Sequence, residues 1–305
     1  MCPPSASRSS STGSRRSARS SSDIALNATQ LLIPVLTYHA ARVGGSDYAS
    51  NDHVAFFDDL RQLHREGFRI AKLDDIVASL RRGAPDLSAT VGISMDDGTN
   101  FDYHDLPHPA WGAQRSMLNI MKDFVDEFGQ RAQPDLHVTS FVIASPAARR
   151  ELDKKCLAGR NWYTDDWWPD AIASGLMSIA NHSWDHNHPA VGVVAQRNQE
   201  KGTFSVIDTY EDAEAQIRQA TEYLARKTAG QASRLFAYPY GQFNSYLTDE
   251  YLPHFGSQHG MEAAFTAGSG MISETSKRWT LPRLVCGHDW KSGAELGAIL
   301  ARARG

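Results

Sequence analysis

Short apolar runs alternate with amphipathic stretches from residue 31 to the end of the chain. The apolar runs have the length of buried strands and lie at residues 31–39, 68–71, 89–98, 137–144, 233–241, 263–267 and 279–287. Between them, apolar residues recur at helical spacing, which predicts helices at residues 54–68, 73–80, 114–128, 209–230 and 293–302. The segment 167–186 begins with a helical pattern and ends in a group of histidines.

This alternation of strands and helices favours an α/β fold built from βα units, with mainly parallel strands in a closed or an open sheet. In parallel α/β folds, active sites form at the carboxyl ends of the strands. Polar residues follow predicted strands at Asp96-Asp97 and at Tyr240-Gly241. These positions are therefore the first candidates for a functional site.

The composition excludes several classes of protein. The 305 residues are 41% hydrophobic and 22% charged, which suffices for a sizeable core. With 31 basic and 35 acidic residues, the net charge of −4 argues against a nucleic-acid-binding protein. No apolar run approaches the ~20 residues of a membrane span. The three cysteines lie far apart, which argues against a disulfide framework or a cysteine-rich zinc site.

The N-terminus has a composition of its own. Residues 1–22 contain ten serines and four arginines but no acidic residue, so they cannot bury enough apolar surface to offset the entropy of ordering. We predict a disordered tail over residues 1–27 and one folded domain over residues 28–305. No apolar segment of an export signal follows Arg15-Arg16, so a cytoplasmic location is the default expectation, and an extracytoplasmic one stays open.

Two aspartates and a glycine, Asp96-Asp97-Gly98, directly follow a predicted strand. At the frayed end of a strand both carboxylates can reach one cleft, where one can bind a metal and the other can act as a base. The alternative is an ordinary turn, because Asp and Gly are common turn residues.

A second group of polar residues spans His182 to His186 in the sequence HSWDH. Histidines four residues apart lie on one face of a helix, and this spacing suits two imidazole ligands of zinc. Solvent-exposed histidines are the alternative. Together with Asp97, the pair would form a site of two histidines and one carboxylate with an open position, which is typical of catalytic zinc.

Two further sequence features give only weak evidence of function when each is considered alone. The loop around Tyr240, in AYPYG, can present a backbone N–H to a developing oxyanion, but it also resembles an ordinary tight turn. His39 ends the first predicted strand, where a histidine is more often structural.

Taken together, SMDDG, HSWDH and AYPYG resemble the three motifs of the polysaccharide deacetylase family, also called NodB-homology domains or carbohydrate esterase family 4. The resemblance covers about residues 31–290 and implies a distorted (β/α) barrel with metal-dependent N-deacetylase activity. By position, it implies that Asp97, His182 and His186 are the metal ligands. It further implies that Asp96 is the general base and that the backbone N–H of Tyr240 helps to hold the oxyanion.

The sequence departs from the family pattern in two places. Ala237 stands where the third motif usually has an arginine that orients the base, and Arg283 is either its substitute or an ordinary arginine. The family's general-acid histidine usually lies near the C-terminus, whereas the sequence around His288 has the wrong spacing. LTYH at the N-terminus instead resembles the permuted bacterial poly-N-acetylglucosamine deacetylases, which makes His39 the candidate acid.

We therefore predict a hydrolase that uses a divalent metal, with zinc as the first choice, to remove N-acetyl groups from an amino-sugar polymer or oligosaccharide. The expected partner is an N-acetylated glycan, with neither a nucleic acid nor a membrane span, and the oligomeric state stays open. Two alternatives are an amidase of a small non-sugar amide and a catalytically impaired glycan-binding module, which the missing arginine favours.

Overall fold

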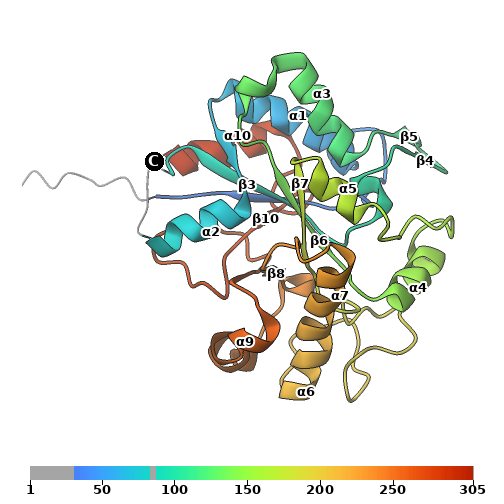
Figure 1. The fold of residues 1–305 in the computed structure, drawn as a ribbon. Coiled ribbons are helices and arrows are strands. Elements are labelled where there is room, and N and C mark those ends of the chain that lie inside the picture. Colours follow the sequence, from blue (N-terminus) through green and yellow to red (C-terminus); the bar gives the residue numbers. More distant parts are fainter. Residues whose placement is uncertain (1–30, 83–86, 305) are drawn as a thin grey trace, which may run out of the picture.

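The computed structural model describes residues 31–82 and 87–304. A curled parallel sheet lies at its centre, with strands in the order β10-β1-β3-β6-β7-β8-β9 and with β2 beside β3 (Figure 1). The strands of this sheet are β1 (Val35–Tyr38), β2 (Arg69–Ala71), β3 (Thr90–Met95), β6 (Val138–Val142), β7 (Met177–Asn181), β8 (Leu235–Ala237), β9 (Ala263–Phe265) and β10 (Leu284–Val285). The first predicted strand and helix are thereby confirmed near their expected places, as β1 and α1 (Asp52–Arg65).

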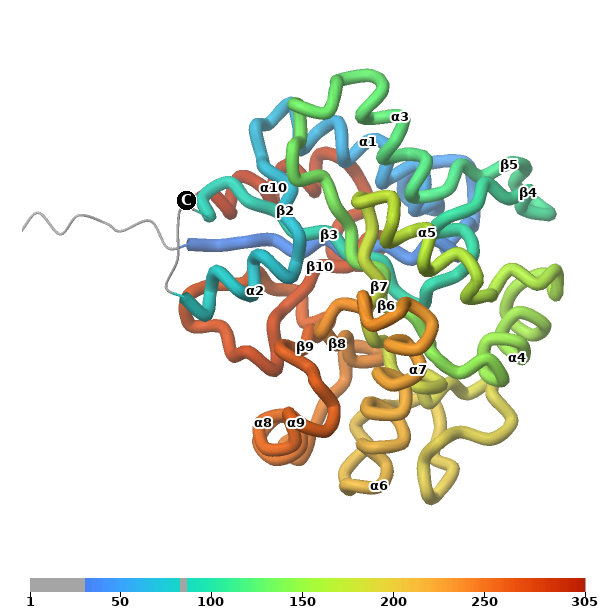
Figure 2. The backbone as a smooth tube through the Cα atoms, viewed as in Figure 1, coloured from blue at the N-terminus to red at the C-terminus, as the bar shows by residue number. Residues whose placement is uncertain are grey.

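The segment that ends in β10 closes the sheet on itself. Leu281 pairs with Phe265 of β9, and three residues later Leu284 pairs with Leu36 of β1, both in parallel register. Figure 2 shows this red segment beside the blue first strand. The predicted distorted (β/α) barrel with mainly parallel strands is therefore confirmed.

Helices surround the barrel. Besides α1 they are α2 (Leu73–Arg82), α3 (Met117–Phe128), α4 (Pro146–Cys156), α5 (Trp168–Ala173), α6 (Tyr210–Ala213), α7 (Gln219–Lys227), α8 (Leu252–His254), α9 (Gly256–His259) and α10 (Gly293–Arg304). In Figure 1, α1, α3 and α10 lie together on one side of the sheet, and α6 and α7 lie on the opposite side. No helix of the described residues is long and apolar enough to cross a membrane.

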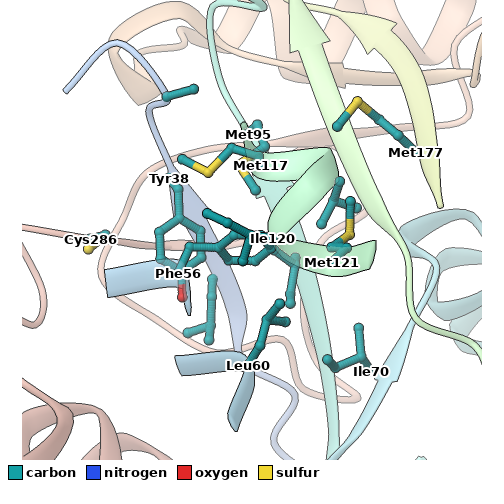
Figure 3. Close-up of a cluster of buried hydrophobic side chains, with 14 of the residues drawn as sticks. Tyr38, Phe56, Leu60, Ile70, Met95, Met117, Ile120, Met121, Met177 and Cys286 are labelled. Carbon is teal, nitrogen blue, oxygen red and sulfur yellow. The ribbon is translucent and has the colours of Figure 1, made fainter. Parts of the chain in front are cut away.

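The main core holds the ends of the first strands in place. Tyr38 of β1, Phe56 of α1, Met95 of β3 and Met121 of α3 are all buried there (Figure 3). The Tyr38 and Phe56 rings meet edge to face, 5.1 Å apart, and the Tyr38 hydroxyl donates to Asp59 at 2.8 Å. Close packing of this kind leaves the carboxyl ends of β1 and β3 little freedom to move.

Several elements differ from the sequence expectations. The segment 167–186 contains the short helix α5 and then the strand β7, whose apolar residues pair with β6 and β8. Helix α3 begins at Met117, because the Ser116 side chain caps it by accepting from the Asn119 N–H at 3.1 Å. The helix α4 and a hairpin of β4 (Leu106–His108) and β5 (Gly112–Gln114) were not predicted. The tail predicted over residues 1–27 lies outside the described residues.

Candidate active site

One cavity of about 470 Å³ lies at the carboxyl end of the barrel. Its volume falls in the usual range for small-molecule sites. All six residues singled out from the sequence line it. The complete lining is His39, Asp96, Asp97, His182, His186, His188, Tyr240, Gly241, Ala267, Val285 and His288.

The barrel brings these residues together because each follows the end of a strand. His39 follows β1, Asp96 and Asp97 follow β3, His182 follows β7, and Tyr240 lies in the short turn Pro239–Gly241 after β8. Parallel strands end on the same rim, so residues that are far apart in sequence share one cavity.

A sharp turn separates the two aspartates. Asp97 has a φ of 73° and Gly98 a φ of 74°, both in the left-handed region. A Cβ atom on Gly98 would lie 2.3 Å from Cγ1 of Val142, so only glycine fits at this position. The Tyr163 hydroxyl stabilises the turn by donating a hydrogen bond to the Asp97 carbonyl at 2.9 Å.

Asp97, His182 and His186 have the geometry of a metal site. Their candidate ligand atoms all lie within 4.8 Å of one another. Asp97 Oδ1 is 3.8 Å from Nε2 of each histidine. An ion about 2.0–2.2 Å from each ligand needs ligand atoms roughly 3–4 Å apart, so small movements of these side chains would enclose one.

His182 is already in the form that a metal requires. Its Nδ1 lies 2.8 Å from the carbonyl oxygen of Ala237, which can only accept a hydrogen bond. The hydrogen therefore sits on Nδ1, and Nε2 keeps its lone pair facing Asp97. A residue at the end of the neighbouring strand β8 thus sets the tautomer of this histidine.

His186 reaches the site from a turn and not from a helix. The segment after β7 turns through Ser183 and His186, whose φ values are 70° and 62°. The Ser183 hydroxyl oxygen accepts from the His186 N–H at 2.9 Å, and the Tyr240 ring packs 4.4 Å from the imidazole. The pair was suggested by helical spacing, but the structure brings it beside Asp97 through a turn.

Arg283 supplies the guanidinium that is missing at Ala237. Its Nη1 and Nη2 donate to the two oxygens of Asp96 at 2.7 and 2.8 Å, and the arginine is completely buried. Burial alone would raise the pKa of Asp96, but the Arg283 guanidinium, through its charge and its two hydrogen bonds, holds it well below its usual range. Asp96 is consequently a fixed and ionised carboxylate.

Three further residues lie at or near the cavity and were not among the site residues predicted from the sequence. His188 lines it, and the spacing of two residues from His186 was the only signal in the sequence. His288, set aside on its spacing, lies at the exposed rim with Nδ1 3.3 Å from Asp289. Asp102, in the short turn Asn100–Asp102, is completely buried nearby and accepts from the Ser140 hydroxyl at 2.6 Å.

Comparison with known proteins agrees with this arrangement. Residues 132–256 match the family model described as polysaccharide deacetylase, a range that includes His182, His186 and Tyr240. The aspartate pair and His39 lie outside the matched range. Comparison with curated protein sequences gave no match.

Solved structures share the fold. IcaB from Ammonifex degensii is 18% identical, with a TM-score of 0.59 over 90% of this chain and 98% of its own. A de-N-acetylase from Aggregatibacter actinomycetemcomitans is 16% identical, with a TM-score of 0.59 over 88% and 99%. The Bacillus anthracis protein BA0330 is 13% identical with a TM-score of 0.53, and this chain covers 65% of its length.

The matched range contains two of the three motifs that suggested the family, and the barrel around it continues on both sides. The chain is therefore similar to the polysaccharide deacetylase family over residues 132–256, and it shares its fold with a solved de-N-acetylase.

Proposed function

We propose that this protein is a metal-dependent N-deacetylase that acts on an N-acetylated amino-sugar polymer or oligosaccharide. The observation that supports it most is the convergence, in one cavity, of the Asp97, His182 and His186 cluster with the Arg283–Asp96 pair. The first group can hold a divalent metal, for which zinc is the first choice because it favours imidazole and carboxylate ligands. The second provides an ionised base beside it.

The chemistry divides between the metal and the protein. A divalent metal in this site would polarise the acetyl carbonyl and favour ionisation of water. Asp96 accepts a proton from the attacking water, while Arg283 keeps both carboxylate oxygens in a fixed orientation. The backbone N–H of Tyr240, a residue that lines the same cavity, stabilises the negative charge that develops on the carbonyl oxygen.

His39 completes the reaction as the general acid. The carbon of the acetyl group gains a bond to the water oxygen and loses its bond to nitrogen, and the nitrogen leaves with a proton from His39. The products are acetate and a free amine. His39 lines the same cavity as Asp96, and its backbone N–H is fixed by Asp52 at 2.7 Å. A histidine suits this step because a protonated imidazole can donate a proton near neutral pH.

The matching family model, described as polysaccharide deacetylase, and a structural neighbour described as a de-N-acetylase support an acetylated glycan as the substrate class. Arg283 also weakens the case for an impaired glycan-binding module, since that alternative rested on the absence of an arginine beside the base. An amidase of a small non-sugar amide would use the same residues, so the substrate panel has to separate the two.

The test is acetate release from a panel of N-acetylglucosamine oligomers and small aryl acetamides, before and after treatment with a chelator. We expect release from the oligomers, its loss after chelation, and its recovery when zinc is added back. The matched variant is His186→Ala, which should bind less than one metal per chain because three ligands become two. Activity on the small amides alone would support the amidase, and full activity after chelation would contradict the metal.

A further inference from the structure

A third histidine, His188, lines the cavity but takes no part in the proposed reaction. It lies two residues beyond His186, half-buried, with the two rings 5.8 Å apart. It is not a member of the cluster whose ligand atoms lie within 4.8 Å of one another. Its position is therefore beside the candidate metal site and not in it.

The backbone around His188 fixes which ring nitrogen carries the hydrogen. The N–H of Ala190 donates to Nδ1 of His188 at 3.0 Å, and this bond needs a lone pair on Nδ1. In the neutral imidazole the single hydrogen must then sit on Nε2. Because Nδ1 is turned toward its own backbone, Nε2 on the other side of the ring is the nitrogen left to serve as a donor.

The segment that carries His188 is held firmly. The His188 N–H donates to the Asp185 carbonyl at 3.2 Å, and the Val191 N–H donates to the His188 carbonyl at 3.0 Å. Just before it, the Asn187 side-chain amide donates to the carbonyls of Glu200 and Thr203, both at 2.6 Å. A donor on so rigid a turn loses little conformational entropy when it binds a ligand.

We propose that His188 is a substrate-binding residue that donates a hydrogen bond from Nε2 to an oxygen of the sugar whose acetamide is cleaved. The ligand class follows from the chemistry: a neutral N–H donor at the edge of a polar cavity recognises a hydroxyl or ring oxygen, of which a sugar has several. This inference rests on the proposed function, because it assigns a contact to the sugar and none to the reacting acetyl group.

The test compares two substrates on three variants. The substrates are an N-acetylglucosamine oligomer and p-nitrophenyl acetate, which carries an acetyl group but no sugar. His188→Leu removes the donor at similar size, and His188→Gln replaces it with an amide N–H. His254→Leu is the control, because His254 is an exposed histidine on α8 that does not line the cavity. Metal content and thermal unfolding of each variant are measured alongside.

For the oligomer, we expect His188→Leu to raise KM roughly three- to tenfold with little change in kcat. The reason is that the variant loses one ordinary hydrogen bond, which the enzyme makes equally with the bound substrate and with the transition state. His188→Gln should recover most of this loss. Hydrolysis of p-nitrophenyl acetate, the metal content and the His254→Leu control should stay at wild-type values.

Other results overturn the proposal in distinct ways. If the His188 variants lost activity equally on both substrates, His188 would lie at the reacting acetyl group. If they lost the metal, His188 would be a metal ligand. An unchanged KM for the oligomer in both variants would remove it from substrate binding. If the wild type cleaves p-nitrophenyl acetate but no acetylated oligomer, the proposed function fails, and the sugar contact fails with it.

Discussion

Asp96 and Asp102 are buried carboxyl groups on the same stretch of chain, yet their surroundings give them opposite charge states. Asp96 receives two hydrogen bonds from Arg283, whereas Asp102 receives one from the Ser140 hydroxyl, and its second oxygen has no partner among the described residues. Burial raises the pKa of Asp102 to about 8, while Arg283 holds the pKa of Asp96 well below its usual range. The counter-ion, and not burial, therefore decides which of them is a carboxylate at neutral pH.

The largest effect should come from removing the ionised carboxylate. Asp96→Asn cannot accept a proton from water and leaves Arg283 facing a neutral amide. We expect kcat for acetate release to fall about 10⁴-fold, the upper end of the range for a general base, with metal content unchanged. Steady-state kinetics and metal analysis of the purified variant check this.

The neighbouring aspartate provides the matched variant. Asp97 faces the two candidate histidine ligands, so Asp97→Asn should weaken metal binding by at least the ~10–100-fold that is typical even for outer partners of a metal site. If Asp97→Asn kept the metal and Asp96→Asn lost it, the roles of base and ligand would be reversed.

The next effect should be on stability. Arg283→Met leaves Asp96 buried without its counter-ion, which typically costs ~3–5 kcal/mol. Chemical denaturation measures the free energy of unfolding. The double variant Asp96→Asn/Arg283→Met should recover part of the loss, because no uncompensated charge remains. Equal destabilisation in the single and double variants would show that the pair matters for packing and not for charge.

Variants of two histidines can identify the residue that donates a proton to the leaving nitrogen. His39→Ala should lower kcat about 10²–10³-fold, because the leaving nitrogen loses its acid, and metal content should not change. The alkaline limb of its pH–rate profile should flatten. His288 lies on the exposed rim, so His288→Ala should have the smaller effect. The opposite order would make His288 the acid.

The smallest effect, measured per pH unit, concerns Asp102, whose folded-state pKa of about 8 lies above the ~3.9 of an unfolded aspartate. Between about pH 4 and 8 the Asp102 carboxyl is ionised in the unfolded chain but protonated in the folded protein. The free energy of unfolding should therefore fall by about 1.4 kcal/mol for each pH unit in this range. Asp102→Asn should remove this contribution, and a slope unchanged from the wild type would show that Asp102 is ionised in the folded protein.

The candidate site residues could be predicted from the sequence where they belong to short contiguous motifs. The two aspartates, the two histidines, Tyr240 and His39 stand at or just after the ends of strands, and the topology of a parallel barrel is enough to bring them to one rim. The barrel itself followed from the alternation of apolar runs and amphipathic helices.

Contacts between distant segments could not be predicted in the same way. Arg283 and Asp96 are 187 residues apart, and no local pattern distinguishes this arginine from a surface one. The strand β7 was overlooked because its short apolar sequence directly follows a helix and directly precedes the histidines. Likewise, the burial of Asp102 depends on Ser140 and on the strands packed around it, which lie outside its own sequence neighbourhood.

The strand segment that closes the barrel also has a consequence for biosynthesis. It carries Arg283, so the charge pair with Asp96 cannot form until the chain as far as Arg283 has left the ribosome. Two strands that are so far apart in sequence pair late in folding, because contacts formed earlier must first offset the entropy lost when the long intervening loop closes. Formation of the Arg283–Asp96 pair and completion of the barrel are thus one event, and a nascent chain that ends before this segment has an aspartate without its counter-ion.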